Sequence, residues 1–142
     1  MILRETPDVP RADLVALYDA VGWVAYTRDP DALARATAAS TYVVSLWDDD
    51  ALVALARCLS DDVAICYVQD ILVHPDYQRQ GLGRRLMRHC LERFAHVRMT
   101  VLLTDDSEQQ LRFYTALGFT NTRDLPFALN TFVRMRPPEN AE

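Results

Sequence analysis

The sequence predicts one α/β domain in which helices cover both faces of a single mixed β-sheet. The chain has 142 residues, of which 50% are hydrophobic and 25% are charged, a composition typical of globular domains rather than disordered chains. Apolar residues recur at helical spacing in some segments and at strand spacing in others, and no segment repeats at a fixed period. We expect a single domain over residues 1–136 and a flexible C-terminal tail over residues 137–142.

The first half of the chain is predicted to place a strand and two helices before an antiparallel run of strands. Pro10 opens the first helix, in which Leu14 and Leu17 recur at helical spacing, and Gly22 ends it. The period then changes to that of strands, and the aspartates at 48–50 indicate a hairpin turn. In chain order, the expected elements are a strand at 2–5, helices at 10–21 and 31–39, and strands at 42–47, 51–59 and 63–73.

The second half is predicted to complete a β-α-β crossover. Strand 63–73 carries apolar residues on both faces, which is typical of a central strand. The remaining expected elements are a helix at 82–94, a strand at 97–103, a helix at 107–118 and a last strand at 127–135. The order β-α-α-β-β-β-α-β-α-β-β joins an antiparallel half to a crossover and therefore predicts a mixed sheet.

Charge and composition exclude several classes of function. A net charge of −5 disfavours nucleic acid and an anionic membrane as partners. All fifteen basic residues are arginines, so Schiff-base chemistry and a Walker-type loop, which need lysine, are excluded. The three cysteines and three histidines have no metal-ligand spacing, so we expect no metal site and no disulfide framework. The sequence shows no secretory pattern and no bilayer-length apolar run, so we expect a cytoplasmic protein.

Two of the four glycines, Gly81 and Gly83, stand between the long strand and the next helix. A helix N-terminus carries unpaired amides and partial positive charge, and glycine lets an anion approach the backbone, so this turn is a candidate phosphate site. Arg79 and Arg84 add positive charge that suits a pyrophosphate. The same glycines would also permit a tight turn with close helix–strand packing. The dinucleotide fingerprint does not fit, because Leu86 stands in the place of its third glycine.

Two motifs in this chain resemble those of the GNAT superfamily of N-acetyltransferases. The pattern Gln-x-x-Gly-x-Gly, which begins at Gln78 after a strand ending in Val-His-Pro, resembles the family's acyl-CoA-binding motif. The segment 111–119, which carries Tyr114 and closes in Leu-Gly-Phe, is similar to a later motif of the family. The sequence departs from the family pattern at Ser107, where many relatives have asparagine, and at Gln78, where arginine is common. The resemblance implies the family's fold and acetyl-CoA as the co-substrate.

The resemblance also implies how acetyl-CoA would be held. The strand at 63–73 would separate from the next strand, and Leu72 and Val73 would hydrogen-bond the pantetheine arm as an added strand would. Ser107 would cap its helix and is a candidate contact of the same arm. The pyrophosphate would be held by the turn residues Gln78, Arg79, Gln80, Gly81, Leu82, Gly83 and Arg84.

Tyr114 and Asp70 are the candidate catalytic residues. A phenol titrates near about 10 and a thiol near about 8.5, so Tyr114 can protonate the departing CoA thiolate and still be protonated at neutral pH. Strand alternation puts Asp70 on the same face as Val68 and Leu72, where an unpartnered carboxylate is costly. Burial would raise its pKa toward that of a general base, acting directly or through a water molecule. A structural hydrogen bond or a substrate contact is the alternative role for Asp70.

The acceptor amine is expected at the connection between the first two helices. Trp23 and Tyr26 offer stacking or cation–π contact there, and equally they could fill the edge of the core. Asp105 and Asp106, which follow a strand end, could also attract or deprotonate a cationic amine, although acidic residues are favoured there by the helix dipole alone. His74 is expected to be a turn residue beside a proline.

Together these observations predict an N-acetyltransferase that moves an acetyl group from acetyl-CoA to a small-molecule amine by direct attack. Acetylation of a protein or peptide amine is one alternative. A non-catalytic CoA-binding module is another, and a ligand-binding domain without a CoA site is a third. The family resemblance also raises a homodimer that pairs through the last strand, 127–135.

Overall fold

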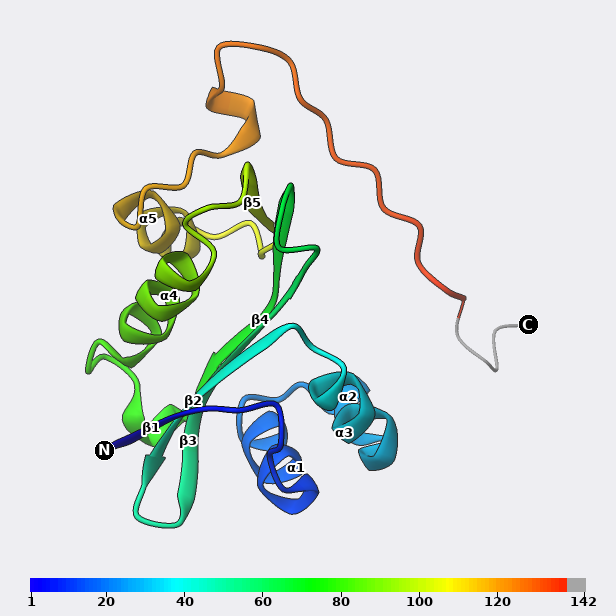
Figure 1. Ribbon diagram of the computed structural model, residues 1–142, viewed down its shortest axis with the longest axis vertical. Coiled ribbons are helices and arrows are strands. Elements are labelled where there is room, and N and C mark those ends of the chain that lie inside the picture. Colours follow the sequence, from blue (N-terminus) through cyan, green and yellow to red (C-terminus); the bar gives the residue numbers. More distant parts are fainter. Residues whose placement is uncertain (138–142) are drawn as a thin grey trace. The chain divides into compact units, whose positions relative to one another are not determined.

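The computed structural model describes residues 1–137. Its central element is a five-stranded mixed sheet (Figure 1). Its strands lie side by side in chain order: β1 (Ile2–Glu5), β2 (Tyr42–Asp48), β3 (Ala51–Ser60), β4 (Ile65–Val73) and β5 (Met99–Leu102). Strands β1 to β4 pair antiparallel, whereas β4 and β5 are parallel. The structure confirms the predicted antiparallel half joined to a β-α-β crossover.

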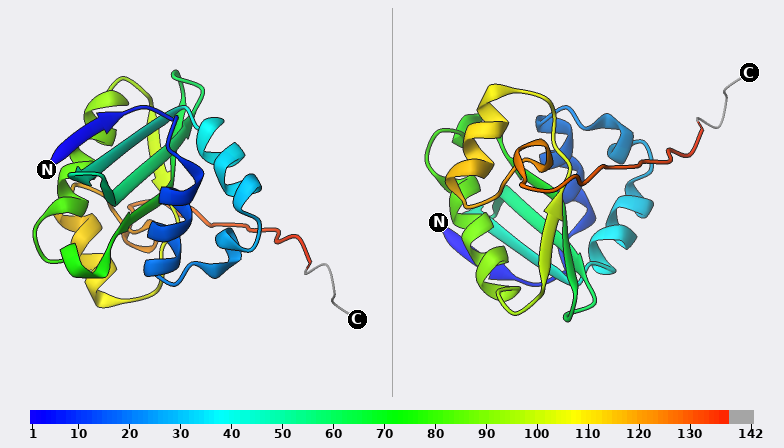
Figure 2. Two further views of the ribbon diagram at one scale, coloured as in Figure 1. Left: turned by 90° about the horizontal axis from the view of Figure 1, so that it is seen from below. Right: turned by 90° about the horizontal axis from the view of Figure 1, so that it is seen from above.

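The chain divides into two compact units. The first, Met1–Thr104, contains the sheet, and the second begins at Asp105. The helices of the first unit are α1 (Arg11–Ala20), α2 (Val24–Thr27), α3 (Pro30–Ala38), the 3-10 turn η1 (Pro75–Tyr77) and α4 (Leu82–Arg93). Figure 2 shows α1 (blue) and α3 (cyan) on one face of the sheet and α4 (green) on the other, which confirms the predicted layers. The one-turn helix α2 was not predicted. Within residues 1–137, no helix has both the length and the apolar character needed to cross a membrane.

Helix α1 covers its face of the sheet because its apolar residues recur three and four positions apart. Leu14, Leu17 and Tyr18 are fully buried and share one apolar cluster with Leu55 of β3 and Leu72 of β4. Full burial of one such leucine side chain stabilises the fold by about 1.5–3 kcal/mol. Helix α1 is therefore firmly packed against the sheet, and this packing fixes the position from which the connection to α2 begins.

Helix α4 covers the opposite face with the same kind of pattern. Leu86, Met87 and Cys90 are buried, whereas Arg84 and Arg88 are exposed. This amphipathic arrangement confirms the helix predicted at 82–94 and leaves its arginines in solvent.

A β-bulge in β4 decides which way Asp70 faces. Arg57 of β3 lies opposite Asp70, but the next residue, Cys58, lies opposite Val68, so Gln69 is an extra residue between them. Consecutive strand residues point to opposite faces, and cross-strand partners share a face. Asp70 therefore points toward α1, whereas Val68 points toward α4. The prediction that Val68 and Asp70 share a face is wrong, because simple alternation does not hold across a bulge.

The Asp70 carboxylate lies in a buried ion pair that joins β3 and β4 to α1 and α2. Its Oδ2 accepts from Nε of Arg57 at 2.7 Å and from the Tyr18 hydroxyl at 2.9 Å, and its Oδ1 accepts from the Tyr26 hydroxyl at 2.9 Å. Asp70 is only 3% exposed and Arg57 only 5%. Arg57 also donates to the Ser40 hydroxyl at 3.3 Å. A charge in this position is tolerated only when it is paired and hydrogen-bonded, so these side chains hold one another in place.

The second unit begins with α5 (Glu108–Ala116), followed by the 3-10 turn η2 (Thr122–Asp124). The Ser107 hydroxyl accepts from the Gln110 amide at 3.2 Å and caps α5, as predicted. Gly118, with φ of +94°, ends the helix region in the left-handed conformation that the sequence indicates.

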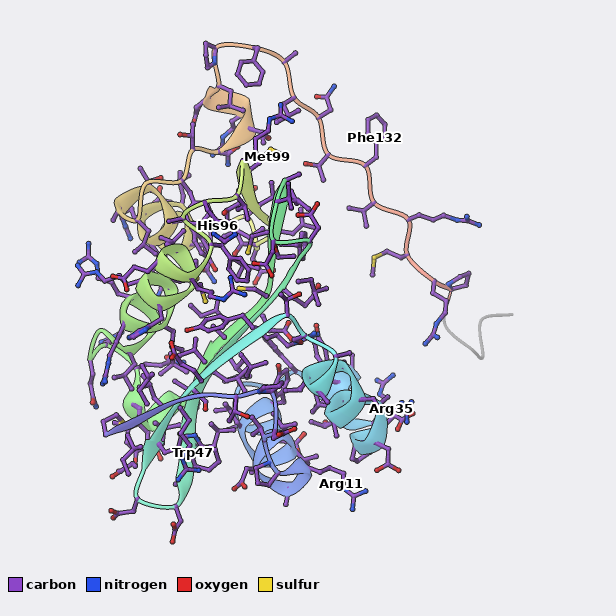
Figure 3. The ribbon with its side chains drawn as sticks, viewed as in Figure 1. Arg11, Arg35, Trp47, His96, Met99 and Phe132 are labelled. Atoms are coloured by element: carbon purple, nitrogen blue, oxygen red, sulfur yellow. The ribbon has the colours of Figure 1, made fainter. Side chains whose placement is uncertain are left out.

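The last strand predicted at 127–135 does not form. Residues 125–137 belong to no strand, and Phe132, which projects from an extended trace in Figure 3, is 93% exposed. Strand propensity largely reflects packing against neighbouring strands, and this segment pairs with none in the described part of the chain. The described sheet therefore ends at β5, without the final strands of the predicted order. Beyond residue 137, the predicted tail lies outside the described residues.

We expect the Arg57–Asp70 pair to stabilise the fold through the partnership rather than through either group alone. Asp70→Asn leaves the Arg57 guanidinium buried without a counter-charge, so the free energy of unfolding should fall by about 3–5 kcal/mol. The double variant Arg57→Met/Asp70→Asn removes both charges and should be more stable than Asp70→Asn. Chemical denaturation of the two single variants and the double variant measures the coupling. If the loss of unfolding free energy in the double variant equalled the sum of the losses in Arg57→Met and Asp70→Asn, the two residues would not be coupled and the prediction would be contradicted.

Candidate functional site

The N-terminus of α4 presents free backbone amides in a positively charged setting. Gly81 precedes the helix with φ of +76°, and no side chain in the described part of the chain caps the first turn of α4. The helical hydrogen bonds begin with the Arg85 amide, which donates to the Gly81 carbonyl at 3.0 Å. The first turn of this helix holds no acidic residue, and Arg84 and Arg85 are exposed. The amides and the helix dipole are therefore available to an anion such as a diphosphate.

The loop before α4 is strained and held by local hydrogen bonds. Arg79 has φ of +64°, a left-handed conformation that costs a non-glycine residue about 1–2 kcal/mol. The Gln78 side chain donates to the Val73 carbonyl at 3.1 Å, and Nδ1 of His74 accepts from the Asp76 amide at 3.1 Å. His74 is therefore a turn residue, as the sequence predicts. Strain that is kept in a restrained loop is typical of binding sites.

Within residues 1–137, the C-terminal half of β4 has no partner strand on the side of β5. Parallel pairing with β5 covers only Ile65 to Val68, whereas antiparallel pairing with β3 continues to Val73. Leu72 and Val73 therefore lie where β4 and β5 no longer pair, as predicted. A strand edge of this kind can accept an extended ligand that carries amide groups.

Trp23 and Tyr26 form one aromatic surface with Tyr18 at the edge of the α1 core. The ring centroids of Tyr26 and Tyr18 are 5.2 Å apart, those of Trp23 and Tyr26 are 6.0 Å apart, and those of Tyr18 and Trp23 are 5.8 Å apart. Tyr18 is fully enclosed, whereas Trp23 and Tyr26 are partly exposed. The two residues thus pack on the core and also present ring surface to solvent.

Asp70 and Tyr26, which the sequence assigned to different roles, are directly hydrogen-bonded. Three donors occupy the Asp70 carboxylate, out of roughly four acceptor sites that a carboxylate offers. This geometry supports the structural hydrogen bond that the sequence left open beside the base role. Burial, and then the Asp70 carboxylate, raise the pKa of Tyr26, so its phenol stays protonated at neutral pH.

Sequence reasoning did not identify Arg57 and Tyr18 as partners of Asp70, or Gln69 as a partner of Tyr26. A signal for Arg57 was present: it is the one charged residue of the segment 51–59, and Asp70 is the one charged residue of 63–73. Opposite charges on neighbouring apolar strands are expected to pair. Tyr18 and Gln69 gave no comparable signal, because their partners depend on the bulge.

Tyr114 is buried on α5 between two aromatic rings. Its ring centroid lies 4.9 Å from that of Phe113 and 5.8 Å from that of Phe119, each at an interplanar angle of 80°. Burial raises the pKa of the Tyr114 phenol. The group therefore remains protonated at neutral pH, as a proton donor must.

The other predicted residues of the second unit lie at its start. Asp105, Asp106 and Ser107 are exposed, and the Ser107 amide donates to the Asp105 carbonyl at 3.0 Å. A pocket of about 320 Å³, lined by residues from Thr122 to Asn130, contains none of the predicted site residues. The candidate site therefore rests on the geometry of individual groups and not on this pocket.

Comparison with known proteins gives consistent results. The profile of the acetyltransferase (GNAT) family matches residues 11–119. The uncharacterised N-acetyltransferase ycf52 of Gracilaria tenuistipitata var. liui is 31% identical over 117 residues, which cover 79% of this chain and 63% of the relative. Histone acetyltransferase TAP1 of Glycine max is 32% identical over 130 residues, which cover 84% of this chain and 55% of that protein. The chain thus spans less than two thirds of either relative.

A solved structure matches over nearly its whole length. A GNAT-family acetyltransferase from Streptococcus pneumoniae superposes with a TM-score of 0.80 and 30% identity, and the match covers 95% of this chain and 98% of the other. The family profile spans the first helix, the glycine turn and the Tyr114 segment, so it covers all of the predicted site residues. The chain belongs to the GNAT acetyltransferase family.

Proposed function

We propose that the chain transfers an acetyl group from acetyl-CoA to a primary amine of a small molecule, by direct attack of the amine on the thioester. One observation carries this proposal: a single loop, residues 74–81, joins the unpaired end of β4 to the uncapped N-terminus of α4. Within this loop, the Gln78 side chain donates a hydrogen bond back to the Val73 carbonyl at the end of β4. A cationic cradle and an open strand edge, joined in this way, fit the diphosphate and the pantetheine arm of one coenzyme.

The coenzyme would be held mainly by main-chain groups. The turn residues Gln78, Arg79, Gln80, Gly81, Leu82, Gly83 and Arg84 would surround the diphosphate. Leu72 and Val73 would pair with the pantetheine amides, and Ser107, which already caps α5, is the further candidate contact. When bound, acetyl-CoA supplies an activated carbonyl and a thiolate leaving group.

As the amine nitrogen bonds to the acetyl carbon and the thioester C–S bond breaks, Tyr114 would donate its hydroxyl proton to the CoA sulfur. The proton that the nitrogen loses would return through solvent to the Tyr114 oxygen. The support for this role of Tyr114 is the protonated phenol that burial maintains on α5. A backbone N–H near Val73 would donate to the oxygen on which negative charge develops.

The acceptor amine would bind at Trp23 and Tyr26, whose rings are partly exposed. Asp70 would act on the acceptor side of the site. Its three hydrogen bonds favour a role in which it orients the Tyr26 hydroxyl over a role as the general base that removes a proton from the amine, which is the alternative.

A protein or peptide amine is the second candidate acceptor, favoured by the similarity to a relative named as a histone acetyltransferase. A module that binds CoA without turnover is the third. Thiol release from acetyl-CoA separates them when it is measured over small amines, aminoglycosides and lysine-rich peptides, with CoA binding followed by calorimetry. The proposed function expects CoA binding, and thiol release with small amines. CoA binding without thiol release from any amine indicates the non-catalytic module, and absence of CoA binding overturns the proposal.

We expect Gly81→Ala to weaken CoA binding, because alanine resists the left-handed backbone that opens the α4 cradle. Gly22→Ala is a matched control: its φ is +82° and that of Gly81 is +76°, and a Cβ would meet no atom within 4 Å at either glycine. Both variants should lose about 1 kcal/mol of folding free energy. Only Gly81→Ala should raise the Kd for CoA in calorimetry, by at least about tenfold. Equal CoA affinities in the two variants would contradict the assignment of the cradle.

We expect Tyr114→Phe to lower turnover by about 10²–10⁴-fold while the Kd for CoA stays within about twofold, because a general acid acts on the reaction and not on binding. Tyr42→Phe is the control: it also removes a buried hydroxyl, which donates to Glu5 at 2.6 Å on the β1–β2 pair. Steady-state thiol release and calorimetry measure both effects. In wild-type protein, the raised pKa of Tyr114 predicts that any loss of turnover through ionisation of this phenol begins at a higher pH than it would for an unperturbed tyrosine. Full turnover by Tyr114→Phe would remove the acid role.

A further inference from the structure

Tyr26 combines a partly exposed ring with a hydroxyl group whose hydrogen bonds are set by β4. The hydroxyl donates to Oδ1 of Asp70 at 2.9 Å and accepts from Nε2 of Gln69 at 3.2 Å. A phenol oxygen has one proton to donate and two lone pairs. Its proton and one lone pair are in use, so its remaining capacity is to accept one further hydrogen bond. An amine N–H is a donor of the required kind.

The charge behind Tyr26 is balanced. Asp70 pairs with Arg57, both are at most 5% exposed, and the enclosed Tyr18 hydroxyl completes the carboxylate's contacts. Asp70 therefore acts on a ligand only through Tyr26: it fixes the direction of the hydroxyl and, by accepting its proton in a hydrogen bond, makes the phenol oxygen a better acceptor. Asp70 and Gln69 are in this sense positioning residues.

Trp23 supplies apolar surface beside that oxygen. Its ring centroid lies 6.0 Å from that of Tyr26 at an interplanar angle of 32°. The two rings offer a surface for an aromatic or alkyl group, or for the carbon next to an amine. Because the Asp70 carboxylate is already paired with Arg57, the group formed by Trp23, Tyr26 and Asp70 has no free carboxylate with which to bind a substrate that carries several positive charges.

We propose that the Tyr26 oxygen, oriented by Asp70 and Gln69, accepts the N–H of the substrate amine, and that the rings of Trp23 and Tyr26 pack against an apolar or aromatic skeleton next to that amine. This inference rests on the proposed acetyltransferase function. The substrate class is a primary monoamine on an aromatic or alkyl carbon chain.

The test compares Tyr26→Phe with Tyr18→Phe, since each removes one hydroxyl that donates to the same carboxylate. With 2-phenylethylamine and acetyl-CoA, Tyr26→Phe should raise the KM for the amine at least about tenfold, the effect of one lost hydrogen bond to the ligand. Tyr18→Phe should leave that KM within about twofold of the wild-type value. The melting temperature should fall in both variants. If the hydrogen bonds of Tyr18 and Tyr26 were purely structural, the two variants would change the KM for the amine equally. That result overturns the inference.

A second variant tests the positioning role without disturbing the ion pair. Gln69→Leu removes the donor to the Tyr26 oxygen and should change the KM for the amine at least about threefold, with the Kd for CoA and the melting temperature unchanged. An unchanged KM for the amine removes Gln69 as a positioning residue.

Tryptophan fluorescence gives a readout that does not need turnover. The chain has two tryptophans, and Trp47 is only 3% exposed, so titration of CoA-loaded protein with 2-phenylethylamine should change the signal of Trp23, and Trp23→Phe should abolish the change. No fluorescence change, or a preference for spermidine and kanamycin over 2-phenylethylamine, overturns the inference while the acetyltransferase function stands. Loss of CoA binding in wild-type protein overturns both.

Discussion

A carboxylate that has left water must be surrounded by donors, and this requirement at Asp70 shapes the first unit. Arg57 on β3, Tyr18 on α1 and Tyr26 on α2 all direct a donor to its two oxygens. Each of these contacts also ties one element to the centre of the sheet. The short helix α2, which contains no fully buried residue, is held where its tyrosine meets the carboxylate. The aromatic surface next to it follows from the same contact.

The bulge at Gln69 connects the two halves of the candidate site. It turns Asp70 toward α1 and the aromatic surface, and it follows directly on Val68, the last residue of β4 that pairs with β5. One irregularity thus opens the strand edge that suits the pantetheine arm and orients the group that holds Tyr26. Bulges commonly re-aim side chains beside functional sites, and this one lies between the proposed coenzyme side and the proposed acceptor side.

The proposed coenzyme cradle and the proposed proton donor rely on different physical effects. The α4 N-terminus concentrates positive charge from amides and from Arg84 and Arg85, within a chain of net charge −5. The adjacent loop accepts backbone strain at Arg79 to keep its shape. Tyr114 instead depends on burial, which disfavours the phenolate and so keeps the phenol protonated at neutral pH.

The sequence by itself determined the features that depend on local chemistry. Helical and strand spacing located the five strands and the longer helices α1, α3, α4 and α5. Gly81 marked the turn before α4, and Ser107 marked the cap of α5, because each signal depends on residues within one helical turn or strand. The last strand at 127–135 failed as a prediction because a strand needs a partner, which composition does not reveal. The tertiary structure alone decided that Val68 and Asp70 face opposite ways and that Arg57, Tyr18 and Tyr26 share one carboxylate. The physical reason is that the neighbours of a buried charge depend on strand register, and a single bulged residue changes that register.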